Sequence, residues 1–153
     1  MGKMKHWVPA LLLVILLASG GYALFRVIIN DQLNTAARAG NVVSVQSLLS
    51  RGASIEGRSI HFKTPLMSAA EGGNLNAVLF LLSQGADANA HSDSGSVLIW
   101  AATSGNAGIV RVLIAHGANV NWRSSLGNTA LQTAREYKQT TIAKILQLAG
   151  AKG

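Results

Sequence analysis

The sequence has no cysteine, few aromatic residues and few charges. Of its 153 residues 5% are aromatic and 12% are charged, and only six are acidic. Without cysteine the chain cannot form a disulfide, a thiolate nucleophile or a lipoprotein-type lipid attachment. The charged fraction lies well below the quarter that is usual for a globular domain. These absences exclude disulfide-rich scaffolds and cysteine enzymes. Apolar residues, in contrast, make up 49% of the sequence.

The most apolar part is the N-terminal segment. Lys3 and Lys5 precede 19 residues without a charge, from Trp7 to Phe25. As a helix rising about 1.5 Å per residue, this run would be about 28 Å long, close to the thickness of the hydrocarbon core of a bilayer. Small residues around Ala18 and Ala23 suit a signal peptidase, whereas the residues after Phe25 prolong the apolar character. The pattern predicts that residues 1–29 are either a secretory signal peptide or a single-pass membrane anchor.

Both alternatives give the same topology. Lysines before an apolar segment tend to stay on the cytoplasmic side, so the residues after Phe25 are expected outside the cytoplasm. The predicted location is periplasmic or otherwise extracytoplasmic. The protein would be anchored in the inner membrane by residues 7–25, or soluble after signal cleavage.

The remainder of the chain is an internal repeat. The pair Gly-Ala begins at positions 52, 85, 117 and 150, in steps of 33, 32 and 33 residues. Three other pairs, which include Ala-Ala and Gly-Asn, recur in the same register. A period of this length predicts stacked units, each of which buries its apolar face only against a neighbour.

The repeated unit resembles the ankyrin repeat, on the motif Thr64-Pro65-Leu66-Met67-Ser68-Ala69-Ala70 and on Gly85-Ala86-Asp87-Ala88-Asn89. The resemblance implies an all-α ankyrin-repeat solenoid, made of helix-turn-helix units with short hairpin fingers and preceded by the N-terminal hydrophobic helix. The repeat domain is expected over residues 31–153, with about four repeats: 31–56, 59–90, 91–121 and 124–153. Phe62 stands where the family usually has a hairpin glycine.

The residues at the expected helix ends agree with a helix-turn-helix repeat. Thr64 is expected to cap a helix whose first residue is Pro65, since proline presets φ and has no amide hydrogen to leave unbonded. The apolar residues of the next helix form one stripe that ends near Leu82. Gly85 is then expected to end that helix in the left-handed conformation.

The sequence offers no catalytic arrangement. His61 and His91 occupy similar finger positions, but zinc needs three or four ligands and no third His or Cys is in register. The basic residues of the repeat region are scattered singly, without the aromatic residues that stack on nucleic acids. We therefore predict no enzyme activity, no metal or cofactor, no small-molecule substrate and no nucleic acid.

A protein partner is the remaining expectation. The resemblance implies a continuous surface made by the finger tips and the inner helices, and aromatic and Arg residues dominate the energetics of interfaces. Trp100 either packs within the array or takes part in binding. The predicted partner-binding residues are Phe62, Trp100, Trp122, Tyr137, Ile60, His61, Lys63, Arg38, Glu71 and Asp93.

Three roles fit such a surface outside the cytoplasm. The first is an adaptor or chaperone-like partner of an envelope protein. Exported bacterial proteins of similar organisation have been linked to oxidative-stress defence, and the resemblance permits that role. The second is a periplasmic immunity protein that inhibits a toxin. The third is an accessory subunit of a membrane enzyme complex, contacted through the N-terminal helix.

Overall fold

The protein is built almost entirely from helices. The computed structural model describes the backbone of residues 7–152 and the side chains of residues 21–152. In chain order the elements are α1 (Trp7–Arg38), α2 (Val42–Ser50), α3 (Pro65–Glu71), α4 (Leu75–Ser83), β1 (His91–Ser92), β2 (Gly95–Ser96), α5 (Val97–Ser104), α6 (Ala107–Ala115), α7 (Ala130–Glu136) and α8 (Thr140–Leu148).

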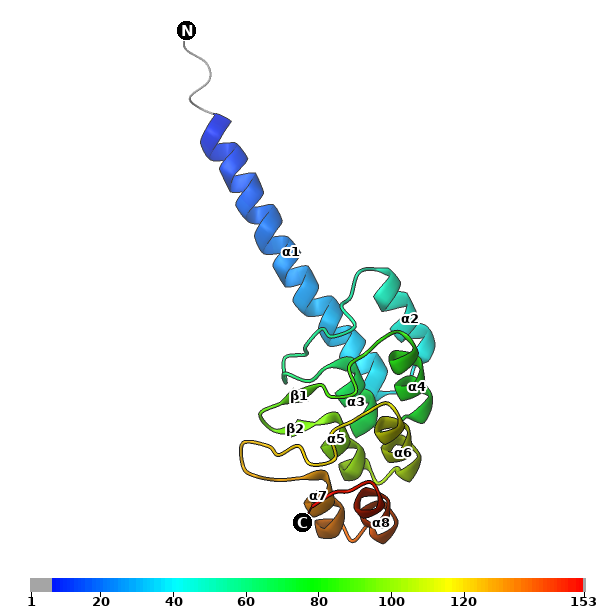
Figure 1. Ribbon diagram of the computed structural model, residues 1–153. Helices are drawn as coiled ribbons and strands as arrows, with labels where there is room; N and C mark the ends of the chain where they lie inside the picture. Colours follow the sequence, from blue (N-terminus) through cyan, green and yellow to red (C-terminus); the bar gives the residue numbers. More distant parts are fainter. Residues whose placement is uncertain (1–6, 153) are drawn as a thin grey trace.

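The helices form two parallel stacks. The C-terminal part of α1 packs on α3, α3 on α5 and α5 on α7, while α2, α4, α6 and α8 make the second stack in the same order. We call these the inner and outer helices. Figure 1 shows the helix pairs following one another down the array, with the C-terminus at the end opposite to the N-terminus. The expected all-α solenoid of helix pairs is confirmed.

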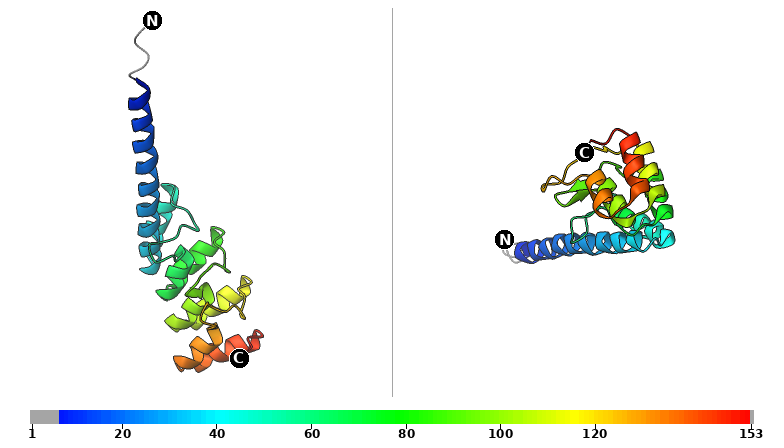
Figure 2. Two further views of the ribbon diagram at one scale, coloured as in Figure 1. Left: turned by 90° about the vertical axis from the view of Figure 1, so that its left-hand side faces the viewer. Right: turned by 90° about the horizontal axis from the view of Figure 1, so that it is seen from below.

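Helix α1 is one continuous helix. It runs from Trp7 through Asn30, where the sequence suggests a boundary, and on to Arg38. Its last turns serve as the inner helix of the first repeat, because Ile29, Leu33 and Ala37 are buried. Its N-terminal part projects away from the array (Figure 2).

The predicted signal peptide or anchor falls largely outside the described side chains, which begin at residue 21. Between residue 21 and the start of burial at Ile29, the large apolar side chains of α1 are exposed: Tyr22, Leu24, Phe25, Val27 and Ile28. Among the described residues, no helix has both the length and the apolar character that crossing a membrane requires.

The inner helices begin as their sequences predict. The Thr64 hydroxyl accepts a hydrogen bond from the amide of Met67, and Pro65 is the first residue of α3. Ser96 and Thr129 cap α5 and α7 in the same way. A cap of this kind satisfies an amide that the helix itself leaves unbonded, and it contributes about 1 kcal/mol.

The turns use left-handed residues. Gly85 follows α4 with a φ of 86°, as the sequence predicts. Within the helix pairs, Gly40, Gly73 and Gly105 have φ values of 70–75°, and Lys138 takes the same place in the last repeat with a φ of 56°. The hairpin turn thus keeps its shape in the last repeat although a side chain has replaced the glycine.

The segments that join successive repeats form three fingers: finger 1 (residues 51–64), finger 2 (84–96) and finger 3 (116–129). Finger 2 contains the short antiparallel pair of β1 and β2. Side chains near the base connect each finger to the next: the Asp87 amide donates to Glu56 Oε1, and the Asn119 amide donates to Asn89 Oδ1, both at 2.8 Å. The fingers therefore form a continuous edge along one side of the array.

Candidate partner-binding surface

The finger tips expose apolar side chains. Ile60 is 64% exposed, Phe62 71% and Leu126 85%. A tip residue lies beyond the helix layers, so it has no core to enter. Of the predicted binding residues, Ile60 and Phe62 lie at the tip of finger 1, and His61 is exposed between them.

Phe62 also has an unusual backbone. Its φ is 58°, in the left-handed region that residues with a Cβ rarely occupy. Fingers 1 and 3 form the same turn: Phe62 N donates to Ser59 O, and Gly127 N donates to Ser124 O. Gly127 has a φ of 82°, so glycine occupies the corresponding position of finger 3. Phe62 is therefore both strained and exposed at a position that suits glycine. Residues with such backbone strain are concentrated at binding sites, which makes Phe62 a candidate binding residue.

Arg58 holds finger 1 against finger 2. Its Nη1 donates to Phe62 O at 2.8 Å, and its Nη2 donates to His91 O at 3.1 Å. A cavity of about 300 Å³ lies here, lined by Arg58, Phe62, His91, Ser92 and Asp93. The sequence analysis did not predict a role for Arg58, because the position of a single Arg in a loop does not indicate which groups it contacts. Its partners are backbone carbonyls that only folding brings near.

Four predicted residues meet where finger 1 joins the inner helices: Lys63 at the end of finger 1, Arg38 on α1, Glu71 on α3 and Trp100 on α5. Lys63 Nζ lies 2.8 Å from Glu71 Oε1 and 3.6 Å from the centre of the Trp100 ring, and Arg38 Nη1 lies 3.6 Å from Glu71 Oε2. The side chains of Lys63 and Glu71 are only 15% and 17% exposed, whereas that of Arg38 is 63% exposed. We call these residues the charged cluster. One carboxylate faces two cations, so Arg38 can offer its guanidinium to an acidic group of a partner.

A polar cavity of about 260 Å³ adjoins the charged cluster. It lies between α1 and finger 1 and is lined in part by Asn34, Thr35, Ile60 and His61. Asn34, which is buried, supports it: its Nδ2 donates to Gly57 O at 2.8 Å, and its Oδ1 accepts from the Ser68 hydroxyl at 2.7 Å. The wall of this cavity is therefore tied to α1, α3 and finger 1.

The two tryptophans among the described side chains, Trp100 and Trp122, are partly buried. The ring of Trp122 packs on that of His91 with centroids 5.2 Å apart and a tilt of 42°, which joins finger 3 to finger 2. Trp100 carries the Lys63 ammonium on one face, and its buried Nε1 has no hydrogen-bond partner among the described residues. Both contacts are intramolecular, so each tryptophan helps to shape the surface whether or not it meets a partner.

The last two predicted residues lie on other elements, although Asp93 also lines the cavity beside Phe62. Asp93 is at the tip of finger 2, where its carbonyl accepts from Ser125 N and from the Ser125 hydroxyl. Tyr137 follows α7 in the last repeat and is 58% exposed. The structure thus groups most of the predicted residues around finger 1 and leaves Tyr137 at the far end of the array. In the part of the chain that is described, no three His, Cys, Asp or Glu residues gather to hold a metal ion.

The family follows from the sequence comparison. The family described as ankyrin repeats (3 copies) matches residues 24–92 and 84–152, which covers most of the chain. The protein belongs to the ankyrin-repeat family, as its repeated motif predicts. None of the curated proteins compared with the chain matches it. Ankyrin repeats are generally protein–protein interaction modules and typically non-enzymatic, so a protein partner is implied in general.

Proposed function

We propose that this protein is an adaptor or chaperone-like partner of an envelope protein, and that it binds that partner outside the cytoplasm through finger 1 and the charged cluster. The observation that carries the proposal is Phe62, which is 71% exposed with a φ of 58°. Neither the exposure of the ring nor its backbone strain helps the array to fold. A partner that buries the ring would account for both features.

The surroundings of Phe62 have the composition of an interface. An aromatic ring that enters a partner's pocket can act as the central anchor, and polar residues around it set the orientation. Ile60 extends the apolar area, and Arg38, whose side chain is 63% exposed, offers a cation near it. A partner that fits would present an apolar pocket flanked by at least one carboxylate.

The proposed location rests on the N-terminal sequence. Lys3 and Lys5, followed by 19 uncharged residues, are typical of a segment that enters the membrane and sends the following domain outward. In the proposal this segment is a single-pass anchor or a signal peptide. The apolar side chains of α1 that are exposed between residues 22 and 28 support the anchor, because they would be covered by membrane lipid.

The proposed location is tested with a C-terminal alkaline phosphatase fusion, which is active only outside the cytoplasm. We expect an active fusion, and an inactive one would refute the location. The mass of the mature protein then decides between anchor and signal peptide, because cleavage would remove the residues before the array.

The binding surface is tested by affinity capture of the tagged full chain from gently crosslinked envelopes. The wild type is compared with Phe62→Ala and with the matched control Leu79→Ala, which removes an apolar side chain that is 43% exposed on outer helix α4. We expect a stoichiometric partner that the wild type and Leu79→Ala retain and Phe62→Ala loses.

Two results would contradict the binding proposal. Equal capture by Phe62→Ala and wild type would remove finger 1 from the interface. Capture of nothing by all variants would argue against a resident envelope partner, and an immunity or inhibitor role against an incoming toxin would then come first. An oxidative-stress role is supported if the captured partner is a detoxifying enzyme.

A further inference from the structure

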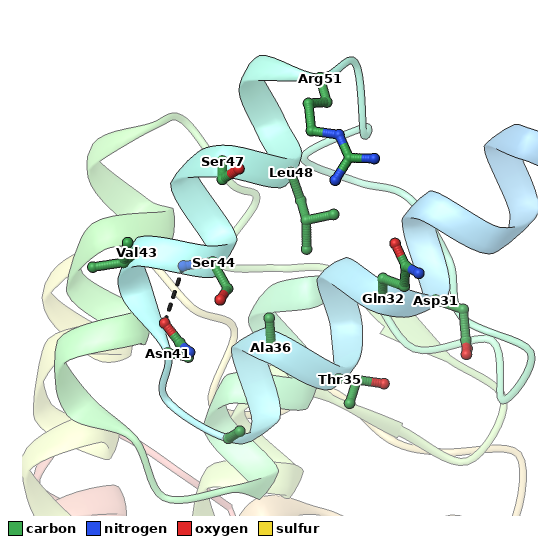
Figure 3. A pocket seen from close by; sticks show the side chains of 11 residues that line it. Asp31, Gln32, Thr35, Ala36, Asn41, Val43, Ser44, Ser47, Leu48 and Arg51 are labelled. Carbon is green, nitrogen blue, oxygen red and sulfur yellow. Dashed lines mark hydrogen bonds between the residues drawn. The ribbon is translucent and has the colours of Figure 1, made fainter.

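The first repeat leaves one side of its helix pair open. A groove of about 590 Å³ lies between α1 and α2, on the side where an earlier repeat would stack. Figure 3 shows its two walls, with Gln32, Thr35 and Ala36 on α1 and with Val43, Ser44 and Ser47 on α2. Val43 is 79% exposed there.

The same side of α1 continues as a regular stripe beyond the groove. A helix turns about 100° per residue, so residues spaced alternately four and three apart share one face. Gly21, Phe25, Ile28, Gln32, Thr35 and Ala39 have this spacing, and all are exposed. At about 1.5 Å per residue the stripe is about 27 Å long. We call these six residues the α1 stripe.

The α1 stripe lies away from the core of its own array. The buried residues Ile29, Leu33 and Ala37 occupy a different side of the helix. Spacings that alternate between four and three residues are the seam geometry of a two-stranded coiled coil, whose seam residues are mainly apolar. In the stripe the apolar side chains are Phe25, Ile28 and Ala39. The stripe contains no charged residue, so two identical stripes can meet without repulsion between like charges.

We propose that two copies of this chain associate in parallel through the α1 stripe, with each α1 lying against the groove of the other copy. This surface borders the finger 1 surface, because Asp31 and Thr35 line the cavities on both sides and Asp31 Oδ1 accepts from the Ile60 amide at 3.3 Å. The dimer does not depend on the proposed function, since it needs no envelope partner. Gln32 lies within the stripe, where its amide can pair with the same amide of the second copy. A polar residue at a seam position sets the register of a coiled coil, and the stripe has Thr35 as a second one.

Charge placement at the edge of the groove favours the parallel arrangement. Asp31 on α1 and Arg51 after α2 lie at the same end of the groove (Figure 3). A two-fold axis along the helices keeps equivalent residues at equal levels, so Asp31 of one copy comes level with Arg51 of the other. An antiparallel pair would place the two residues at opposite ends.

The test uses disulfide crosslinking, which is clean because the chain has no cysteine. Single variants Phe25→Cys, Ile28→Cys, Gln32→Cys and Thr35→Cys of the full chain are oxidised in isolated membranes and as purified protein. Val27→Cys and Arg38→Cys, which are exposed on another side of α1, are the matched controls. We expect dimers from the stripe variants in severalfold higher yield than from the controls, with each residue joined to its own counterpart.

Three results would overturn the proposal. Equal yields on and off the stripe would indicate random collision, and absence of dimers would indicate a monomer. An adduct of a different mass would show that another protein covers the stripe. As a second readout, Asp31→Arg and Arg51→Asp should each lower the dimer fraction of the wild-type cysteine-free chain in sedimentation, and the double variant should restore it. A double variant no better than the singles would contradict the parallel register.

Discussion

At the scale of single residues, the array contains two side chains at backbone positions that suit glycine. Phe62 and Lys138 have φ values of 58° and 56°. Lys138 closes the turn between α7 and α8, where earlier repeats have glycine, while Phe62 lies at a finger tip. A Cβ in the left-handed region costs about 1–2 kcal/mol, since it crowds the following carbonyl. The left-handed turn at Lys138 occurs in every repeat, so the fold itself requires it. At the position of Phe62, finger 3 has Gly127, so the fold does not require an aromatic ring there.

Two substitutions of Phe62 separate the effect of its backbone strain on stability from the effect of its ring. We expect Phe62→Gly to raise the free energy of unfolding by about 1 kcal/mol, because glycine occupies the left-handed region without a Cβ clash. Phe62→Ala is the control: it removes the ring and keeps the Cβ, so its stability should stay within about 0.5 kcal/mol of wild type. Urea unfolding followed by circular dichroism measures both. A Phe62→Gly variant less stable than wild type would show that the ring stabilises the fold.

Sequence reasoning reached Phe62 through the family resemblance, because Phe62 stands where the family usually has a hairpin glycine. The left-handed φ of 58° came from the structure. For Arg58 the family pattern gave no such reference. Its hydrogen bonds to Phe62 O and His91 O depend on how closely two fingers approach, which the residues of one finger do not state.

At the scale of elements, the ends of neighbouring inner helices are in direct contact. Asn74 Nδ2 donates to Arg38 O at 2.6 Å, and one repeat later Asn106 Nδ2 donates to Gly73 O at 3.0 Å. Gly72, at the end of α3, lies so close to Arg38 O that an added Cβ would overlap it. Two of the recurring Gly-Asn pairs therefore link neighbouring repeats through the Asn side chain, and Gly72, which precedes one of the pairs, allows the close approach.

Gly72→Ala tests this spacing. The φ of Gly72 is −71°, which any residue adopts, so the conformational cost of alanine is small. Overlap with a backbone carbonyl should nevertheless lower the free energy of unfolding by about 1–3 kcal/mol. Gly108→Ala is the control, because an added Cβ would lie 3.1 Å from Asn106 Oδ1 and 3.5 Å from Leu75 Cδ2, both side-chain atoms at far longer range than the Arg38 carbonyl is from Gly72. Equal stability of the two variants in thermal unfolding would contradict a tight contact between α1 and α3.

At the scale of the whole molecule, each repeat contacts only its neighbours. The pairs α3–α4 and α5–α6 have a repeat on both sides, whereas α7 and α8 are covered on one side among the described residues. In an array of this kind stability is a sum of unit and interface contributions, and the end units open first. The fold thus predicts graded stability along the chain rather than one uniform value.

Hydrogen exchange with two core variants measures this gradient. Leu98 in α5 and Leu146 in α8 are both fully buried, at 1% and 0% exposure, so each change to alanine should cost about 3 kcal/mol. We expect Leu146→Ala to speed amide exchange in α7 and α8 only, whereas Leu98→Ala speeds it from α3 to α8. Uniform acceleration by Leu146→Ala would indicate that the array opens as one cooperative unit.

The sequence by itself determined the repeat, the all-α class and the residues that begin and end the helices. These features depend on local chemistry: a Thr-Pro pair caps a helix, glycine permits a left-handed turn, and periodic leucines define one buried stripe. Only the tertiary structure decided which side chains meet. Lys63, Glu71, Arg38 and Trp100 come from four separate elements, and their distances follow from how the repeats stack. The continuity of α1 into the first repeat was likewise decided by packing, because burial of Ile29, Leu33 and Ala37 makes the end of α1 part of the array.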